Sequence, residues 1–471
     1  MRRAMFLKRL SRRLLSPYYF SKYAGIPNVY DFYRQYVGHD RLSRKQLLEF
    51  QMRKLKEILL HARDHTEYYR QLFSDYSFDP QKIEAIEQLN CLPVLTKNII
   101  RENLLRLLAD NISENNRHVS FTGGTSGVKM DFFRDNPCRS HRMAFQWRSD
   151  AWAGWSPYSN IAYVWGAMQD FYPRTKLKDR FINDYITGVQ LNFAWSLDEK
   201  KYARLVKNLI KFKPVVIRCI PSPTTLLAEY IIAKGISIPS IKGLVTTAEP
   251  LYPHQRRILE SAFNAPVFNL YASREVGTTA AECIAHRDLH IAVDSVVLEI
   301  TDKGRQLSLG EYGDIVLTDL HNYGMPLIRY SVGDCGQLSD DDCTCGMEYP
   351  MLKNVIGRTI DFFYDAEGKS IISGSMVVDI VDEGPPVGQV QFIQNSVEEI
   401  LVRMTKDPMP DDSVKKFYET QIKKAFKDVT TVKFDIVDRI EKEASGKYRF
   451  TICNIDPAEI ARLKERGRGK K

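Results

Sequence analysis

A glycine-rich loop at residues 121–130, "FTGGTSGVKM", combines backbone flexibility, hydroxyl groups and one positive charge. Its glycines allow successive backbone N–H groups to converge on one point, and the hydroxyls and Lys129 add donors and charge. This combination predicts a cradle for phosphate oxygens. It is not a Walker loop, because Val128 and Met130 replace that loop's second glycine and its hydroxyl residue, and the spacing of a dinucleotide fingerprint is also missing. On these residues alone, an ordinary exposed loop is the alternative.

Cysteine and histidine side chains form a second group with distinctive chemistry. "ECIAHRDLHI" places Cys283 and His290 seven positions apart, and "CTCG" places Cys343 and Cys345 on a turn. Three thiolates and one imidazole could complete a closed tetrahedral zinc site. His286 is a competing ligand, and buried cysteines beside an ordinary surface histidine are the alternative. Because no open coordination position is evident, any metal here is expected to be structural.

The composition is that of a soluble globular protein. The chain has 471 residues, 44% hydrophobic and 27% charged, so it can bury large cores in more than one domain. No apolar run approaches the roughly 20 residues that cross a bilayer. The eight cysteines are mostly scattered and do not resemble a secreted disulfide framework, which favours a reducing cytoplasm.

Positive charge gathers at the two ends of the chain, whose net charge is +9. The first segment, "MRRAMFLKRLSRRLL", predicts a short basic amphipathic helix and lacks the features of a secretory signal. An organelle-targeting peptide, an anchor on an anionic membrane surface and a solvated helix end are all open interpretations. Nucleic-acid binding is not expected, since the body of the chain has no basic stripe with interleaved aromatic residues.

The pattern of apolar residues predicts an α/β fold for the first part of the chain. Helical spacing at 45–73, 199–213 and 223–235 alternates with short apolar runs such as "PVVIRCI" and "IKGLVTTAE". This alternation is typical of layered α/β proteins. Short strands and turns then predict a β-rich subdomain at about 290–356.

The last hundred residues predict a separate, small α+β unit. The strands "QVQFIQ", "EEILVRM" and "VKFDIVDRI" surround a charged helix at 413–427. We therefore expect a large N-terminal domain at 1–357 and a small C-terminal domain at 358–471.

Five further motifs follow the glycine-rich loop in order. They are "TTAEPL" (246–251), "NLYASREVG" (269–277), "PLIRYSVGD" (326–334), "VIGRTIDFF" (355–363) and "EKEASGKYRF" (441–450). Their order and spacing over roughly residues 45–450 resemble the adenylate-forming superfamily of acyl-CoA synthetases, luciferases and peptide-synthetase adenylation domains. "PLIRYSVGD" and the Cys/His pattern look most like the phenylacetate-CoA ligase family and its relatives in capsular-polysaccharide biosynthesis.

The resemblance implies an ATP site. In the family the glycine-rich loop covers the β- and γ-phosphates, an aromatic residue stacks on adenine, and a carboxylate hydrogen-bonds the ribose. The residues assigned to ATP in this way are Thr122, Gly123, Gly124, Thr125, Ser126, Gly127, Lys129, Ala248, Glu249, Pro250, Tyr271, Ser273, Arg274, Asp334 and Arg358. Within this set Tyr271 would stack on the base and Asp334 would bind the ribose.

Mg²⁺ is expected at Glu275 on the same resemblance. Two departures from the family pattern affect the phosphate contacts. Val128 stands where proline often precedes the lysine, and Arg274 stands where threonine usually precedes the glutamate. A guanidinium can also bind phosphate oxygens, so Arg274 is expected to replace the hydroxyl contact.

The resemblance also implies a mobile C-terminal domain. Asp361 lies where the family places its hinge, and Lys447 in "SGK" would bridge the acid and the α-phosphate during adenylation. After rotation of the domain, the loop around Gly374 would line the acceptor site. Related zinc sites in the family favour Cys283, His290, Cys343 and Cys345 as zinc ligands.

These features together predict an ATP-dependent ligase. It would form an acyl-adenylate from a small carboxylic acid and pass the acyl group to coenzyme A or to an amine, such as an amino sugar. An aromatic-rich region at 145–225, with Trp147, Trp152, Trp155, Trp165 and Phe171, could line an aryl-acid pocket, although we favour a core position for each. The alternative is a non-catalytic nucleotide-binding scaffold at a membrane surface. We expect a cytoplasmic protein, with peripheral membrane association through the basic start as an option.

Overall fold

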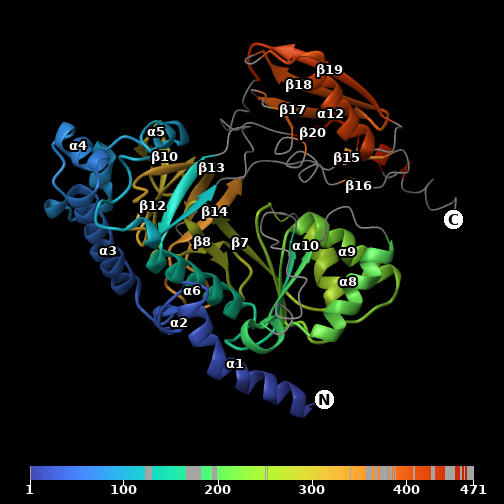
Figure 1. Ribbon diagram of the computed structural model, residues 1–471, viewed down its shortest axis with the longest axis horizontal. Coiled ribbons are helices and arrows are strands. Elements are labelled where there is room, and N and C mark those ends of the chain that lie inside the picture. Colours follow the sequence, from blue (N-terminus) through green and yellow to red (C-terminus); the bar gives the residue numbers. More distant parts are fainter. Residues whose placement is uncertain are drawn as a thin grey trace. The chain divides into compact units, whose positions relative to one another are not determined.

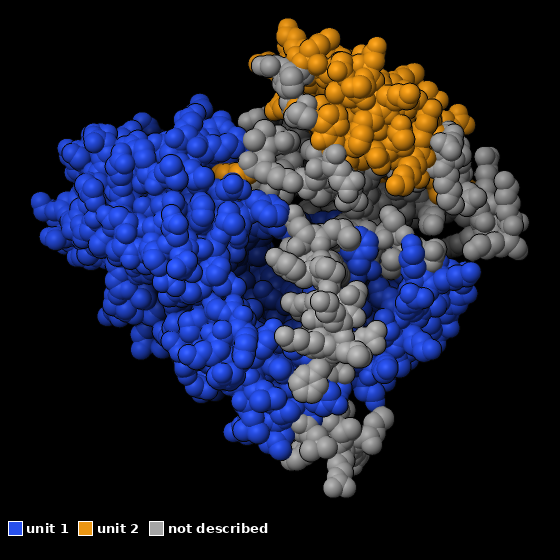
Figure 2. Space-filling model, in the orientation of Figure 1, with its two compact units in different colours: residues 1–121, 131–356 blue, residues 122–130, 357–471 orange. Residues whose placement is uncertain are grey.

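The computed structural model describes most of the chain. The described residues are 2–121, 130–165, 182–193, 199–249, 251, 253–339, 341–356, 363–365, 370–371, 380, 384–385, 387, 389–406, 409–425, 430–440, 451–456, 459–460 and 462–463. The chain divides into two compact units, which Figure 2 colours separately. Unit 1 comprises residues 1–121 and 131–356, and unit 2 comprises residues 122–130 and 357–471.

Unit 1 is organised around a large mixed sheet. Among the described residues, 12 strands pair in the order β11-β10-β12-β13-β14-β9-β8-β7-β6-β5-β3-β4. The last five strands of this order run parallel, and they are β3 (Ile161–Trp165), β4 (Val189–Phe193), β5 (Val216–Cys219), β6 (Gly243–Thr246) and β7 (Val267–Ser273). The α/β architecture expected from the alternating pattern is confirmed.

The parallel strands are buried on both faces. Ile217, Leu244 and Val267 pack on one face against α8 (Glu199–Phe212), α9 (Pro221–Ala233) and α10 (Pro253–Phe263), which Figure 1 shows grouped together. The adjacent residues Val216, Val245 and Phe268 point to the opposite face, towards α6 (Asn136–Trp152). Because side chains alternate along a strand, these continuous apolar runs require a helix layer on each side.

The rest of the sheet of unit 1 is antiparallel and contains the β-rich region predicted at about 290–356, although it begins earlier, at Gly277. Its strands are β8 (Gly277–Glu282), β9 (Leu289–Ile291), β10 (Val296–Asp302), β11 (Arg305–Gln306), β12 (Tyr312–Asp319), β13 (Tyr330–Ser339) and β14 (Met351–Ile356). A separate hairpin pairs β1 (Arg117–Phe121) with β2 (Asp131–Asp135). The hairpin therefore flanks the glycine-rich loop.

The helices before the first strand are α1 (Arg2–Lys22), α2 (Val29–His39), α3 (Arg44–His65), α4 (Glu67–Asp75) and α5 (Lys97–Glu102), with short 3₁₀ turns at Pro80–Lys82, Ile86–Cys91 and Glu114–Asn116. The prediction of a single helix at 45–73 is wrong, because the helix is interrupted at Thr66. This residue is extended (φ −126°, ψ 136°), and its side chain accepts a hydrogen bond from the Tyr69 N–H to cap α4. Tyr69 and Phe73 are buried like the apolar residues of α3, so the apolar pattern continues through the break.

Aromatic residues fill the core between α1, α2 and α6. Trp147 and Trp155 are 9% and 7% exposed, and their ring centroids lie 5.5 Å apart. Phe20 and Tyr30 contact Trp147 from α1 and α2, with centroid distances of 5.4 and 5.0 Å. These two tryptophans are core residues. Phe171 lies outside the described residues.

Unit 2 contains a four-stranded sheet in the order β19-β18-β17-β20 among its described residues. The strands are β17 (Val390–Ser396), β18 (Glu399–Thr405), β19 (Thr431–Val437) and β20 (Thr451–Cys453), and a short hairpin joins β15 (Phe363–Tyr364) and β16 (Ser370–Ile371). Helix α12 (Asp412–Ala425) buries Tyr418 and Ile422 against Phe392 and Val402 of the sheet. The small α+β fold expected for this region is confirmed.

Candidate nucleotide and metal sites

The turn between β7 and β8 carries three of the predicted site residues, Ser273, Arg274 and Glu275. The Ser273 hydroxyl accepts a hydrogen bond from the Val276 N–H at 3.0 Å, which closes the turn. Gly277 follows with φ +100°, and a Cβ on it would lie 3.1 Å from the Arg142 guanidinium carbon. Only glycine suits this position, because the backbone is left-handed there and the guanidinium lies against it.

Two half-buried arginines hold the backbone of this turn. Arg142 of α6 donates from Nη1 to the Glu275 carbonyl at 2.8 Å and from Nη2 to the Arg274 carbonyl at 2.7 Å. Arg134 of β2 donates to the same Arg274 carbonyl at 2.6 Å. Burial, together with the neighbouring Arg142 charge, lowers the pKa of Arg134 to about 9. Sequence reasoning missed both arginines, because neither lies within a motif.

The Glu275 carboxylate is nearly buried, with 7% of the residue exposed. Its Oε1 accepts a hydrogen bond from the Tyr330 hydroxyl at 2.9 Å and lies 3.6 Å from Lys97 Nζ. Tyr330 belongs to the motif "PLIRYSVGD", so the sequence offered a signal that it could lie beside Glu275. Lys97 precedes all of the motifs, and nothing in the sequence marked it as a partner of Glu275. A fixed carboxylate of this kind has the chemistry of a Mg²⁺ ligand.

Tyr271 and Asp334 are brought together from different motifs. The Tyr271 hydroxyl on β7 donates to Asp334 Oδ2 on β13 at 2.9 Å. This bond orients the carboxylate, whose two oxygens have several acceptor positions between them. The predicted adenine-stacking residue and the predicted ribose-binding residue are therefore direct neighbours.

Ala248 and Glu249 follow strand β6 at the carboxyl edge of the parallel strands. Ala248 is in the left-handed region with φ +74°. Glu249 Oε2 accepts a hydrogen bond from the Ser222 N–H at 3.1 Å, at the start of α9. Burial raises the pKa of the Glu249 carboxyl, and the hydrogen bonds from Ser222 partly oppose that rise. Ligands of open α/β sheets bind at this edge.

Other predicted site residues lie outside the described residues, and their roles stay predictions. They are Thr122, Gly123, Gly124, Thr125, Ser126, Gly127, Lys129, Pro250, Arg358, Asp361, Gly374 and Lys447.

The four predicted metal ligands form one cluster. Cys283 follows β8, His290 is on β9, and Cys343 and Cys345 are on the connection from β13 to β14. Their ligand atoms all lie within 4.8 Å of one another, with 3.5 Å between the sulfurs of Cys283 and Cys343 and 3.3 Å between Cys345 Sγ and His290 Nε2. Sulfurs bound to a tetrahedral zinc ion lie ~3.8 Å apart, so the cluster has the dimensions of such a site.

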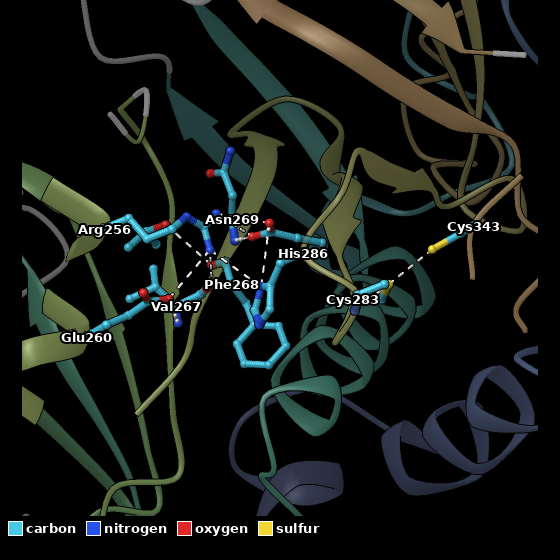
Figure 3. Close-up of polar contacts among 11 residues, drawn as sticks. Arg256, Glu260, Val267, Phe268, Asn269, Cys283, His286 and Cys343 are labelled. Atoms are coloured by element: carbon cyan, nitrogen blue, oxygen red, sulfur yellow. Dashed lines mark hydrogen bonds and ion pairs between the residues drawn. The ribbon is translucent and has the colours of Figure 1, made fainter. Parts of the chain in front are cut away.

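His286, the competing ligand, contacts a different group of residues. Figure 3 shows its ring beside Phe268 and Arg256, away from the line between Cys283 and Cys343. Its Nδ1 lies 3.6 Å from a carboxylate oxygen of Glu282. It is absent from the group of atoms that could share a metal ion among the described residues, which favours His290.

Burial affects the ionisation of the cluster. It raises the pKa of the Cys283 thiol to about 12 and lowers the pKa of His290 to about 4. A neutral imidazole is the form that binds metal, but the thiols must lose protons when a metal binds. The donor set is therefore suited to a cation that stabilises thiolates.

The nucleotide motifs and the Cys/His cluster occur in a chain with clear relatives. A family model described as the CapK C-terminal domain matches residues 363–454. The chain is 25% identical over 416 residues to Protein CapK of Staphylococcus aureus, covering 87% of this chain and 90% of that protein. It is 27% identical over 332 residues to a phenylacetate-coenzyme A ligase of Thermus thermophilus, covering 68% and 72%.

The fold is also similar to that of a solved protein. A crystal structure of 2-hydroxyisobutyryl-CoA ligase matches with a TM-score of 0.60 at 19% identity, covering 92% of this chain and 94% of that one. In sequence and fold the chain is thus similar to adenylate-forming proteins, with CapK and phenylacetate-CoA ligases among its relatives, as its motifs predicted.

Proposed function

We propose that this adenylate-forming ligase activates a carboxylic acid with ATP, releases pyrophosphate, and transfers the acyl group to coenzyme A or to an amine. The observation that carries the proposal is the assembly in unit 1 of Tyr271 with Asp334 and of Glu275 with Tyr330, residues from two separate motifs. The kinship with phenylacetate-coenzyme A ligases supports coenzyme A as acceptor. An amine acceptor, such as an amino sugar, rests on the resemblance to polysaccharide-pathway relatives.

Several side chains of unit 1 would take part in adenylation by binding ATP or by holding the site in place. Asp334, oriented by Tyr271, would accept hydrogen bonds from the ribose hydroxyls. Glu275 would hold Mg²⁺, which when bound offsets the negative charge of the phosphates. The guanidinium groups of Arg142 and Arg134 would keep the turn that carries Glu275 in place through the substrate's binding and release.

We also propose structural zinc at Cys283, His290, Cys343 and Cys345. Support comes from the ligand distances, which suit tetrahedral coordination, and from the donor set of three sulfurs and one imidazole. The four side chains would fill the coordination shell, so the ion would stabilise the connection between β13 and β14 rather than take part in the reaction.

The experiment that tests the ligase function is acid-dependent exchange of pyrophosphate into ATP by the purified protein, over a broad panel of carboxylic acids. We expect exchange with at least one acid, followed by product formation when coenzyme A or an amino sugar is added. ATP binding measured by calorimetry, with no exchange across the panel, would instead support the non-catalytic scaffold.

A second experiment separates the two half-reactions. A single positioned charge is typically worth about 10² to 10³ in rate, so Lys447→Ala should nearly abolish adenylate formation. Given chemically prepared acyl-adenylate and the acceptor, the same variant should transfer at close to the wild-type rate, whereas a bulky replacement of Gly374 should do the reverse. Equal slowing of both half-reactions by Lys447→Ala would refute the assigned roles of Lys447, of the hinge at Asp361 and of a mobile domain after residue 357.

A further inference from the structure

Helix α1 packs against the rest of unit 1 through polar side chains as well as through Phe20. Arg12 is 2% exposed and donates from Nη1 to the Tyr158 carbonyl at 2.9 Å. The Ser11 hydroxyl donates to the Tyr185 carbonyl at 3.0 Å, and the Ser16 hydroxyl donates to the Ile186 carbonyl. These acceptors lie in or near the π-helix Ile182–Thr187, against which α1 packs.

The opposite face of α1 presents large apolar side chains to solvent. Leu10, Leu14 and Tyr18 are 45%, 68% and 60% exposed. They lie four residues apart and so share one face, while Arg12, Ser16 and Phe20 are offset by two residues and lie on the other. Leu15 adds to the exposed group. A surface helix of a globular domain normally has the reverse orientation, with its apolar stripe towards the core.

The backbone at Gly188 leaves room for the buried Arg12 side chain. Gly188 has φ +68°, and a Cβ on it would lie 2.7 Å from Arg12 Nη1 and 2.9 Å from the Ser159 carbonyl oxygen. Any other residue would meet the buried guanidinium as well as backbone strain. Burying an arginine requires hydrogen-bond partners, and the Tyr158 carbonyl is one of them here. The outward direction of Leu10 and Leu14 therefore follows from how Arg12 is held.

The charged residues at the start of the chain are all basic. Residues 1–30 contain seven of the 67 basic residues and none of the 58 acidic ones. Arg13 and Lys22 are both exposed on α1. None of the described helices could span a bilayer. An exposed apolar stripe combined with basic charge is typical of a helix that lies on a membrane surface.

We propose that α1 binds the surface of an anionic membrane, with Leu10, Leu14 and Tyr18 entering the headgroup region and Arg13 and Lys22 contacting lipid phosphates. The exposed apolar stripe supplies the area to be buried, and the basic residues supply attraction to anionic lipid. A second copy of the chain is the less suitable occupant, because two such positively charged segments would repel each other.

The test is co-sedimentation of the full-length protein with vesicles of phosphatidylcholine alone and of phosphatidylcholine mixed with phosphatidylglycerol. We expect binding only to the mixed vesicles, and weaker binding as salt is added. Changing Leu10→Asn and Leu14→Asn together should weaken binding at least about tenfold, because two apolar side chains leave the interface. The matched control is Leu309→Asn, another leucine that is 63% exposed, which should bind like the wild type.

Thermal unfolding should show that the double variant is folded, since both leucines are exposed. Absence of binding to the mixed vesicles, or equal binding by the double variant, would overturn the proposal. A dimer in sedimentation velocity that the double variant loses would assign the face to a second copy, and would also overturn it. None of these measurements depends on ligase activity.

Discussion

The turn around Glu275 and the Cys/His cluster lie at opposite ends of strand β8, but different groups stabilise them. Glu275 precedes the strand and Cys283 follows it, so the two sites are separated by roughly 20 Å of extended chain. Lys97 and Tyr330 contact the Glu275 carboxylate, and the arginines of β2 and α6 bind the backbone below it. In the cluster, four ligand atoms face one another.

If both sites act as proposed, this difference separates a site that the protein organises by itself from one that needs an ion. Side chains supply the charge and hydrogen bonds around Glu275, so its geometry would exist before a nucleotide binds. At the proposed zinc site, thiolates and an imidazole within 4.8 Å of one another would be stabilised by the cation, and its binding would be part of the folding free energy. Changes at the two sites should therefore affect different properties of the protein.

The largest effect is expected from Glu275→Gln. Loss of the carboxylate charge removes the proposed Mg²⁺ ligand, and we expect pyrophosphate exchange to fall by about 10² to 10³. Metal content and thermal stability should stay close to wild type, because the amide can still accept from Tyr330. The exposed Glu311→Gln serves as the control. A loss of bound zinc in Glu275→Gln would show that the two ends of β8 are not independent.

Replacing Cys343→Ser and Cys345→Ser together should have the opposite profile. We expect zinc, measured by elemental analysis, to be lost and the melting temperature to fall by about 5–10 °C, because a structural ion contributes several kcal/mol to folding. Exchange activity at low temperature should stay within about threefold of wild type. The control is Cys91→Ser, an exposed thiol outside the cluster. Intact wild-type protein that contains no metal would end the zinc proposal.

The smallest effect concerns a part of unit 1 that belongs to neither site. Burial lowers the pKa of His321 to about 4 and that of His141 to about 2, and their ring centroids lie 4.1 Å apart. The folded state thus binds fewer protons than the unfolded state, whose histidines titrate near 6.5. The contribution of the neutral histidines to the free energy of unfolding should be fully present above pH 6.5 and should decrease as the pH falls towards 4.

For His321 alone, the free energy of unfolding should fall by about 2 kcal/mol between pH 6.5 and 5. Denaturant unfolding at a series of pH values measures it, and His321→Gln should flatten the dependence while keeping a donor for the Asp294 carbonyl, which the ring nitrogen contacts at 2.7 Å. An unchanged pH slope in the variant would contradict this origin. The protonation of His321 should destabilise unit 1 as a whole, which contains both ends of β8.

Local sequence was a good guide where local forces decide the structure. Apolar spacing predicted α8 and α9, since a helix forms where one face can be buried. It failed at Thr66, where the side chain caps the next helix although the apolar pattern continues. The site shows the same limit: Glu275 and Asp334 were found from motifs, but Arg142 and Lys97 were not, because nothing near them in the sequence marks their partners.

By itself, the sequence determined the α/β class, the small C-terminal fold, the superfamily and the residue types available for nucleotide and metal chemistry, because these depend on local pattern and on the order of motifs. Only the tertiary structure decided between His286 and His290 for the cluster, placed Arg142 against a carbonyl 132 residues away, and turned the leucines of α1 outwards. Those outcomes depend on which distant backbone groups need a donor and where buried space is available. Contacts of that kind leave no periodic signal in the chain.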